Sequence, residues 1–325
     1  MKKFLTTLLF ISHLSGTDYI DYLHPFHPTT SSNGMVVSQN ALSSNIGTQI
    51  LDMGGNAVDA AVAVGFSLAT TLPRAGNLGG GGFMLVYIKD KNEIFYIDYR
   101  SKSPRNSSIE KLLGTKKIPE RNSKLWERVD YTYLASGVPG TVYGLLEAHK
   151  NFGVLTLEQI MKPVIEQAEN GIVVSSDLNY VIDVTPQLRS DAESFSIFFD
   201  NGEPLKEFSI MKRPDLANTF KEISKHGAKG FYEGIVADKI VEAMEKNGGL
   251  ITHDDLKNYK SFFRMPIALN YKGHMVYTAG PPSGGGITLL TALGVLNNID
   301  IKKYKSDSTK ACLLYTSDAA DDVIS

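Results

Sequence analysis

The sequence predicts a mixed α/β fold that is rich in helix through its middle third. Three observations lead to this prediction: apolar blocks with helical spacing end at glycines, two apolar runs flank a short polar turn as in a β-hairpin, and no internal repeat occurs. The 325 residues are enough to bury a sizeable core, as one large domain or as two smaller ones. Hydrophobic residues make up 42% and charged residues 21% of the chain, which is typical of a globular protein.

The first residues have the order of a secretory signal. MKKFLTTLLFISHLSG begins with two lysines, continues with an apolar stretch from Phe4 to Ile11 and ends in small and polar residues. This apolar stretch is too short to span a bilayer. We expect residues 1–16 to be a signal peptide, residues 17–33 to be a linker, and the protein to be exported to the periplasm or the extracellular space. The alternative is a disordered leader.

Two helices and a hairpin are predicted in the first hundred residues. Residues 41–53 have helical spacing and end at a glycine pair. Asn56 can cap a second helix, which is apolar on nearly every side and should be buried, and Pro73 ends it. FMLVYIKD and EIFYIDYR then read as two strands joined by a turn at residues 90–92.

The rest of the chain is predicted to be mostly helical. Residues 101–136 are polar and rich in turn formers, so we expect a long surface excursion. Glycine stops and a cap at Thr156 predict the later helices: one that follows a turn within 137–153, then 157–171, 215–226 and 234–247, with a last one that ends near Asn298. Pro163 should kink or break the second of these. THDD at 252–255 resembles a capping box, and strands are expected at 266–271 and 274–279.

Residues 79–82 are four consecutive glycines, in GNLGGGGF. Such a run costs much backbone entropy on folding, so it predicts positive φ angles or a close approach of the backbone to a phosphate, a strand or a substrate. Its context excludes a phosphate. Phe83 and Met84 stand where a Walker A loop needs Lys and Ser or Thr, and a dinucleotide site needs the order strand, glycines, helix, which is reversed here.

Several other classes of function are excluded or disfavoured. A formal net charge of −2 gives no reason to expect nucleic acid or an anionic membrane as a partner. The only cysteine, Cys312, allows no disulfide framework and no thiolate metal cluster. His24 and His27 read as part of a flexible polar segment rather than a zinc site. No G-x-S-x-G occurs, Ser283 reads as a turn residue, and nothing calls for a cofactor.

Arg100 is the most interesting charge in the sequence. It stands at the end of the apolar run IFYIDYR, beside Asp98, where side chains converge at the rim of a sheet. Its planar guanidinium can bind a carboxylate through two parallel hydrogen bonds. From the residues alone, the simpler interpretation is a structural ion pair with a neighbouring Asp or Glu. No complete catalytic constellation is present.

Several blocks in one order resemble the γ-glutamyltranspeptidase family. GMVVSQNALSSNIGTQILDMGGNAVDAAVAVGFSLATTLP and GNLGGGGFMLVY are similar to its N-terminal signature, and IDYRSKSP resembles its D-F-R-E-x-A-P segment. SGVPGTVYGLLEAHKNFG, GAKGFYEGIVADKIVEAMEKNGGLITHDDLKNY and the region around PPSGGG follow in the family's order. The resemblance runs from Gly34 to Asp300, and we assign residues 34–308 to the family's large subunit.

The resemblance implies an α+β fold of the N-terminal-nucleophile hydrolase type, an αββα sandwich of which this chain holds an incomplete, helix-rich large-subunit part. It implies a γ-glutamyltransferase or glutathione hydrolase, made as a proenzyme that cleaves itself to free an N-terminal threonine on a small subunit. That threonine attacks the γ-glutamyl amide of glutathione, and the acyl-enzyme passes to water or an acceptor amino acid. The family's arginine that binds the substrate α-carboxylate maps onto Arg100.

The same resemblance gives the glycine run a packing role and shows two departures. The run is expected to let a buried helix turn sharply into a strand whose hairpin partner carries Arg100. The family's glutamate after the arginine is Ser101 here, which puts any support that it gives Arg100 in doubt. The S-x-H-P-L of some members is SQNAL, with Asn40 and Ala41 in the changed places, as in a divergent member or a specificity variant.

The family's T-T-H junction, which carries the nucleophile, does not occur in the sequence, and residues 309–325 do not resemble the family. A divergent end, a frameshift or an artefact would each give such a tail. We expect the chain alone to be an inactive fragment that holds half of a substrate site. The alternatives are a non-catalytic carboxylate-binding or scaffold protein, or a relative acting on cephalosporin-type acyl amides or poly-γ-glutamate. Arg100 favours a γ-glutamyl substrate, because a free α-carboxylate needs a cationic partner.

Overall fold

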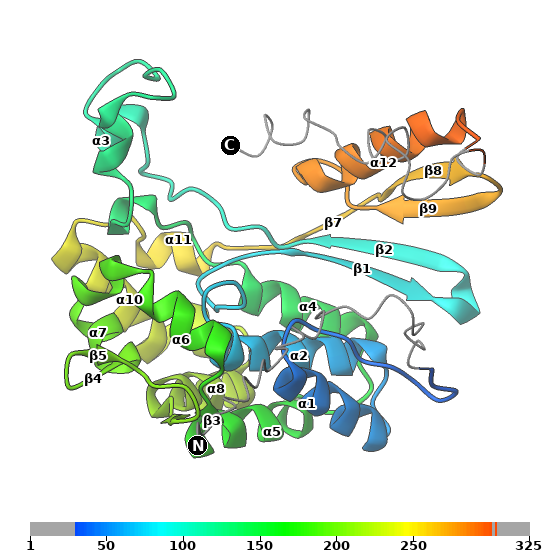
Figure 1. Cartoon of the computed structure of the whole chain (residues 1–325), viewed down its shortest axis with the longest axis horizontal. Helices are drawn as coiled ribbons and strands as arrows, with labels where there is room; N and C mark the ends of the chain where they lie inside the picture. Colours follow the sequence, from blue (N-terminus) through cyan, green and yellow to red (C-terminus); the bar gives the residue numbers. More distant parts are fainter. Residues whose placement is uncertain (1–29, 301–302, 304–325) are drawn as a thin grey trace, which may run out of the picture. The chain divides into compact units, whose positions relative to one another are not determined.

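The computed structural model describes residues 30–300 and residue 303 (Figure 1). The chain divides into two compact units, Met1–Met35 and Val36–Ser325. Every helix and strand given below belongs to the second unit. No helix in the described part of the chain is long and apolar enough to cross a membrane.

Some predicted features lie outside the described residues. These are the signal peptide at 1–16, most of the linker at 17–33 with His24 and His27, and the tail at 309–325. They stay predictions from the sequence.

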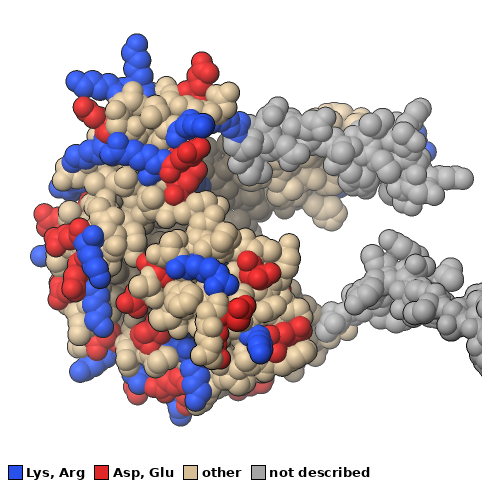
Figure 2. All heavy atoms as spheres, turned by 60° about the vertical axis from the view of Figure 1, so that its left-hand side comes forward, with Lys and Arg blue, Asp and Glu red and all other residues tan. Residues whose placement is uncertain are grey.

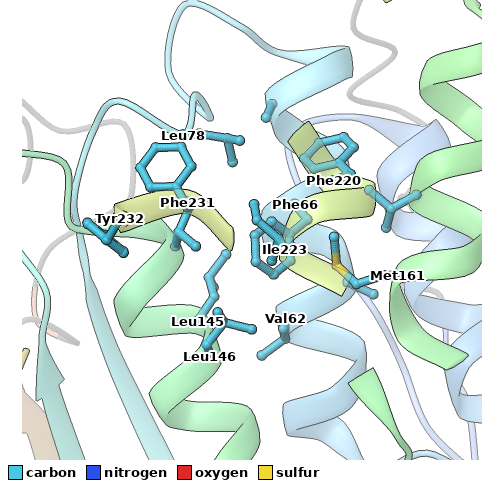
Figure 3. Packing of buried hydrophobic residues seen from close by; sticks show 14 of the residues in the cluster. Val62, Phe66, Leu78, Leu145, Leu146, Met161, Phe220, Ile223, Phe231 and Tyr232 are labelled. Carbon is cyan, nitrogen blue, oxygen red and sulfur yellow. The ribbon is translucent and has the colours of Figure 1, made fainter. Parts of the chain in front are cut away.

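A layer of helices forms the main core. Its members are α1 (Ala41–Asp52), α2 (Ala57–Thr71), α4 (Thr141–Phe152), α5 (Leu157–Asn170) and α8 (Pro214–His226). α2 packs against α1, α4 and α5, and most of its side chains are buried, as its apolar sequence predicts. Phe66 of α2 meets Phe220 of α8 edge to face, with ring centroids 6.1 Å apart, at the centre of this core (Figure 3).

Polar caps set the first residues of two helices as predicted. The Asn56 side chain accepts hydrogen bonds from the amides of Val58 and Asp59, while the Asp59 carboxylate accepts from the Asn56 amide at 3.0 Å. Thr252 and Asp255 form the same reciprocal box at the start of α11 (His253–Lys257). The predicted helix starts at these positions are therefore confirmed.

Pro163 does not break the helix that contains it. α5 runs from Leu157 to Asn170 as one element, with the proline inside it, so the break that we allowed for is wrong. Ile160 and Met161 before the proline and Val164 after it are all fully buried. This burial on both sides of Pro163 holds the helix together despite the missing backbone donor.

A three-stranded antiparallel sheet lies against the helical layer (Figure 1). Its strands, in the order β1-β2-β7, are β1 (Phe83–Ile88), β2 (Glu93–Asp98) and β7 (Phe262–Arg264). β1 and β2 form the predicted hairpin, with Phe83 opposite Asp98. Val86 and Ile97 point into the helical core, where both are buried.

The other face of this sheet exposes apolar side chains. Leu85 and Tyr87 of β1 are 41% and 57% exposed, and Phe262 of β7 is 46% exposed. Side chains on a strand alternate between its faces, so these residues lie on the side opposite Val86 and Ile97. An apolar sheet face of this kind is normally covered in a folded protein.

A second hairpin and a helix follow β7. β8 (Ile267–Tyr271) pairs with β9 (His274–Thr278), and α12 (Gly284–Asn297) packs on β8. α12 is apolar along nearly its whole length, yet Ile287, Leu289 and Val295 are between 43% and 56% exposed. A helix that is apolar all round is usually buried, so α12 is a second surface that lacks a cover among the described residues.

The middle of the chain holds α10 (Gly234–Asn247) as predicted, together with many short elements that the sequence did not indicate. The predicted excursion over 101–136 contains α3 (Ile109–Leu113) and the 3-10 turns η2 (Lys124–Arg128) and η3 (Tyr133–Ala135). The other short elements are β3 (Ile172–Val173), α6 (Ser176–Asp183), η4 (Pro186–Arg189), α7 (Ala192–Phe198), β4 (Phe199–Asp200), β5 (Glu203–Pro204), β6 (Ile210–Met211) and α9 (Lys229–Tyr232). Elements of two to eight residues are too short to show a periodic pattern.

Candidate functional site

Arg100 stands just after β2, at the end of the sheet. The ring of Tyr99 turns toward α4, where it packs on Gly144, so the strand alternation places Arg100 on the opposite side, with Asp98. The Arg100 side chain is exposed. Within the described part of the chain its guanidinium has no hydrogen-bond or salt-bridge partner.

Asp98 pairs with a different arginine. Its Oδ2 lies 2.7 Å from Nε of Arg264 on the neighbouring strand β7, while its Oδ1 accepts a hydrogen bond from the backbone amide of Arg100 at 3.0 Å. Asp98 is only 4% exposed, so both contacts are made by a buried carboxylate. The ion pair with Asp98 is therefore made by Arg264, and the Arg100 guanidinium has no acidic partner in the part of the chain that the structure describes.

The backbone around Arg100 is held at several points. Tyr99 exchanges two hydrogen bonds with Gly82, of 3.0 and 3.3 Å. The carbonyl of Arg100 accepts a hydrogen bond of 2.9 Å from the hydroxyl of Tyr259. Lys102 exchanges two hydrogen bonds with Val138, of 2.7 and 3.2 Å. The main chain from 99 to 102 is therefore fixed, and the Arg100 side chain extends from a rigid segment of backbone.

The glycine run, at Gly81 and Gly82, packs directly against residues 99–101. A Cβ added at Gly81 would overlap the Ser101 amide and come within 2.7 Å of the Tyr99 carbonyl oxygen. A Cβ at Gly82 would lie 2.8 Å from the Tyr99 ring. The glycines of this run are not among those with positive φ angles. Gly81 and Gly82 are thus explained by the close approach of residues 99–101, whereas a Cβ at Gly79 or Gly80 would meet nothing nearer than 3.4 Å.

Three tyrosines pack together beside the backbone of residues 99–102. Tyr232 of α9 stacks on Tyr259 at 5.7 Å, and Tyr143 of α4 packs edge-on against both. The Tyr232 hydroxyl donates to the Pro139 carbonyl at 2.8 Å and accepts from the Tyr143 amide. Burial raises the pKa of Tyr232 and of Tyr259 far above the usual 10.0, so both hydroxyls remain protonated at neutral pH.

Lys102 adds a second cation close to Asp98. Its Nζ donates to the Lys260 carbonyl at 2.7 Å and lies 4.7 Å from the ring centre of Tyr259 and 4.3 Å from that of Phe262. Burial lowers the pKa of Lys102, as does Arg264, while Asp98 acts in the opposite direction. Lys102 and Arg264 lie beside a single buried carboxylate, and Arg100 follows it two residues along the chain, so the segment has an excess of positive charge that suits an anionic ligand.

The described surface around Arg100 is open. A cavity of about 400 Å³ lies behind the tyrosines, lined by Tyr143, Tyr232 and Tyr259, but Arg100 does not line it. No cluster of His, Cys, Asp or Glu in the described part of the chain could hold a metal ion. The view in Figure 2 shows basic and acidic side chains mixed over one face rather than gathered by sign.

The sequence predicts Arg100 as a site residue but does not indicate the residues that orient it. Arg264 lies on β7, a three-residue strand that no pattern indicated. Its one signal is a charge that ends the apolar pair Phe262-Phe263 just before a proline-containing segment. Tyr259 follows the capping box of α11 and showed no signal at all. Asn40, a departure from the family pattern, caps α1 by accepting a hydrogen bond from the Leu42 amide at 2.9 Å.

Comparison with known proteins reveals close relatives. A sequence model of the family described as gamma-glutamyltranspeptidase matches residues 43–318, and so reaches into the segment 309–325 that we set apart as a tail. The chain is 40% identical over 291 residues to the glutathione hydrolase proenzyme of Escherichia coli, covering 88% of this chain and 49% of that protein. It is 36% identical over 269 residues to the capsule biosynthesis protein CapD proenzyme of Bacillus anthracis, covering 82% and 45%.

Solved structures agree with the sequence relatives. The crystal structure of Helicobacter pylori gamma-glutamyltranspeptidase matches with a TM-score of 0.82 and 35% identity, over 89% of this chain and 81% of that one. The prediction of an α+β, N-terminal-nucleophile hydrolase-type fold, rich in helix, is therefore confirmed. The chain spans about half the length of the curated relatives that it matches.

Proposed function

Because the chain belongs to the gamma-glutamyltranspeptidase family, we propose that it supplies the large-subunit part of a γ-glutamyltransferase or glutathione hydrolase. In this proposal its substrate is a γ-glutamyl compound such as glutathione. The observation that carries the proposal is the guanidinium of Arg100, which has no partner among the described residues and extends from a backbone that is fixed from 99 to 102.

Arg100 is proposed to bind the α-carboxylate of the γ-glutamyl group. An arginine with a neighbouring acidic partner would already be neutralised, but Asp98 is occupied by Arg264. Because the backbone of residues 99–102 is already rigid, less conformational entropy is lost when the Arg100 side chain binds a carboxylate. The same geometry holds the γ-amide at one fixed distance from the arginine, where a nucleophile can reach it.

The chemical step needs a nucleophile that we place outside these 325 residues. In the proposed reaction, the hydroxyl of an N-terminal threonine adds to the γ-carbonyl carbon, and its own α-amine takes the hydroxyl proton. The amide C–N bond then breaks, the leaving amine receives a proton, and a γ-glutamyl ester forms on the threonine. Water hydrolyses this ester, or the amine of an acceptor amino acid takes over the γ-glutamyl group.

The two uncovered apolar surfaces fit this arrangement. One is the sheet face with Leu85, Tyr87 and Phe262, and the other consists of the exposed side chains of α12. Both surfaces lack a cover among the described residues. We propose that a small subunit packs on them and completes the substrate site beside Arg100. The chain on its own should then associate or bind hydrophobic dyes, because large exposed apolar patches promote both. A monomer without dye binding would count against this part.

Export is proposed on the leader alone. The charged, apolar and polar order of residues 1–16 supports it. A mass measurement of the protein recovered from the periplasm or the medium would show whether the leader is removed.

A second candidate function is a non-catalytic protein that binds carboxylates, and the open surface at Arg100 favours it as the main alternative. The reading frame beyond Ser325 separates the two. A downstream T-T-H-like junction supports the enzyme, whereas a verified stop codon directly after Ser325 supports the binding protein.

Kinetics of the complete protein test the role of Arg100. With the whole frame expressed, Arg100→Ala should raise the Michaelis constant for γ-glutamyl-p-nitroanilide far more than it changes the turnover number. Losing a charge-assisted hydrogen bond to the α-carboxylate costs about 1.5–3 kcal/mol. An unchanged Michaelis constant would mean that Arg100 is structural.

A further inference from the structure

Tyr259 makes a contact that the packing of its ring does not require. Its ring already stacks on Tyr232 at 5.7 Å and lies under Nζ of Lys102. Its hydroxyl, however, donates to the carbonyl of Arg100, a residue 159 positions away in the sequence. Among the described residues this is the one hydrogen bond that the Arg100 carbonyl accepts.

We propose that Tyr259 is a positioning residue, which sets where the Arg100 guanidinium stands by holding the carbonyl of Arg100. The inference rests on the proposed role of Arg100 in binding a carboxylate, and adds to it the residue that makes the arginine rigid.

The two ends of the Arg100 residue are fixed from different parts of the chain. On one side, Oδ1 of Asp98 accepts the hydrogen bond of the Arg100 amide at 3.0 Å. On the other side, the Tyr259 hydroxyl fixes the carbonyl at 2.9 Å. Two contacts at opposite ends prevent the peptide planes on either side of the residue from rotating, so the Cα–Cβ bond of Arg100 has one direction.

The neighbouring residues leave space for the Tyr259 hydroxyl beside the Arg100 carbonyl. A Cβ added at Gly140 would overlap both that hydroxyl and the Tyr99 carbonyl oxygen, so the glycine leaves room for the contact. Tyr259 is 3% exposed, and water therefore has little access to its ring. The hydroxyl also remains a donor across the physiological pH range, because burial raises the pKa of Tyr259.

Tyr232 offers a matched control in the same cluster. It too is buried, stacks on the same ring and donates its hydroxyl to a backbone carbonyl, that of Pro139. Among the described residues no hydrogen bond joins Tyr232 to Arg100. Tyr259→Phe and Tyr232→Phe each remove one buried hydroxyl and keep the ring. The first releases the Arg100 carbonyl, and the second releases the Pro139 carbonyl and the Tyr143 amide.

Two readouts on the 325-residue chain test the proposal. The first is hydrogen exchange of the Arg100 and Lys102 amides, which should become about tenfold faster in Tyr259→Phe and change less than twofold in Tyr232→Phe. The second is the Kd of γ-glutamyl-p-nitroanilide, followed by ligand-observed NMR. It should rise about three- to tenfold in Tyr259→Phe, the worth of one hydrogen bond. Arg100→Met should weaken binding at least about tenfold, the worth of one charge-assisted hydrogen bond.

The outcomes separate this inference from the proposed function. If Arg100→Met weakens binding while Tyr259→Phe binds like the wild type, the positioning role is wrong and the role of Arg100 stands. If the wild type does not bind the ligand, the proposed function fails on this chain. The hydrogen-exchange rates of the Arg100 and Lys102 amides then test the positioning role of Tyr259 by themselves. Equal exchange in the two phenylalanine variants overturns the positioning role in either case.

Discussion

Nε of Arg264 lies 2.7 Å from Oδ2 of Asp98, so an arginine from β7 neutralises the buried carboxylate beside Arg100. The two residues are 166 positions apart in the sequence and meet because β7 pairs with β2. The pair determines which arginine is free to bind a ligand. It leaves Arg100 exposed and without an acidic partner among the described residues, as a residue that binds an external carboxylate should be.

Removing Arg264 should destabilise the fold. Arg264→Met leaves Asp98 buried without its counter-ion, and breaking a buried pair in this way costs about 3–5 kcal/mol. The Arg264 side chain is 42% exposed, so solvent screening should reduce the loss to about 1–3 kcal/mol. Urea unfolding measures it. Adding Asp98→Asn should recover part of the stability, and no recovery would show that the charge of Asp98 is not the cause.

Gly81 should tolerate a side chain far less well than Gly79. A Cβ at Gly81 would overlap the backbone of residues 99–101, whereas at Gly79 it would meet only Asn77 Oδ1 at 3.4 Å. We expect Gly81→Ala to lower the free energy of unfolding by about 1–3 kcal/mol, the usual cost of overpacking. Gly79→Ala should stay within about 1 kcal/mol of the wild type. Similar values for both variants would contradict the packing role of the run.

Alkaline pH should unfold the protein through its buried tyrosines. Burial raises the pKa of Tyr99 to about 12 from 10.0, so the folded state keeps a proton that the unfolded state loses. The stability from this group is fully present below pH 10 and is lost as the pH rises through about 12, about 3 kcal/mol in all.

Absorbance of tyrosinate and circular dichroism can follow this transition together. Tyrosine ionisation above pH 10 should coincide with loss of structure, and Tyr99→Phe should shift the midpoint to higher pH. Full ionisation of all tyrosines near pH 10 in a protein that stays folded would show that Tyr99 is not protected.

The 325-residue chain alone should not turn over γ-glutamyl-p-nitroanilide. The reason is the missing T-T-H junction, which would carry the nucleophile. Colour release by the purified chain and its mass over several days are the measurements. Self-cleavage or clear turnover would mean that these residues contain a nucleophile of their own.

Local signals in the sequence predict the long elements well. Asn56, Thr156 and Pro73 mark helix ends by chemistry that acts within a few residues, so the sequence alone places α2 and α5. The hairpin of β1 and β2 follows from two apolar runs around a polar turn. Elements that depend on short-range chemistry are the ones that a single sequence reveals.

The support of the site depends on long-range contacts and could not be predicted. Arg264 reaches Asp98 only because β7 adds to the hairpin from a distant part of the chain. Tyr259 reaches Arg100 only once α4, α9 and α11 have packed together. No local pattern encodes either meeting. Of the kink or break predicted at Pro163, the break is wrong for the same reason, since tertiary burial on both sides of the proline outweighs its local preference.

The most direct test of the central claim compares two ligands on the 325-residue chain. γ-Glutamyl-p-nitroanilide and 4-aminobutyryl-p-nitroanilide differ only in the α-carboxylate, and ligand-observed NMR gives the Kd of each. If Arg100 binds that carboxylate, the γ-glutamyl compound should bind at least about tenfold more tightly, as a charge-assisted hydrogen bond of about 1.5–3 kcal/mol would give. Arg100→Met should remove the difference. Equal Kd values for the two ligands on the wild-type chain would contradict the claim.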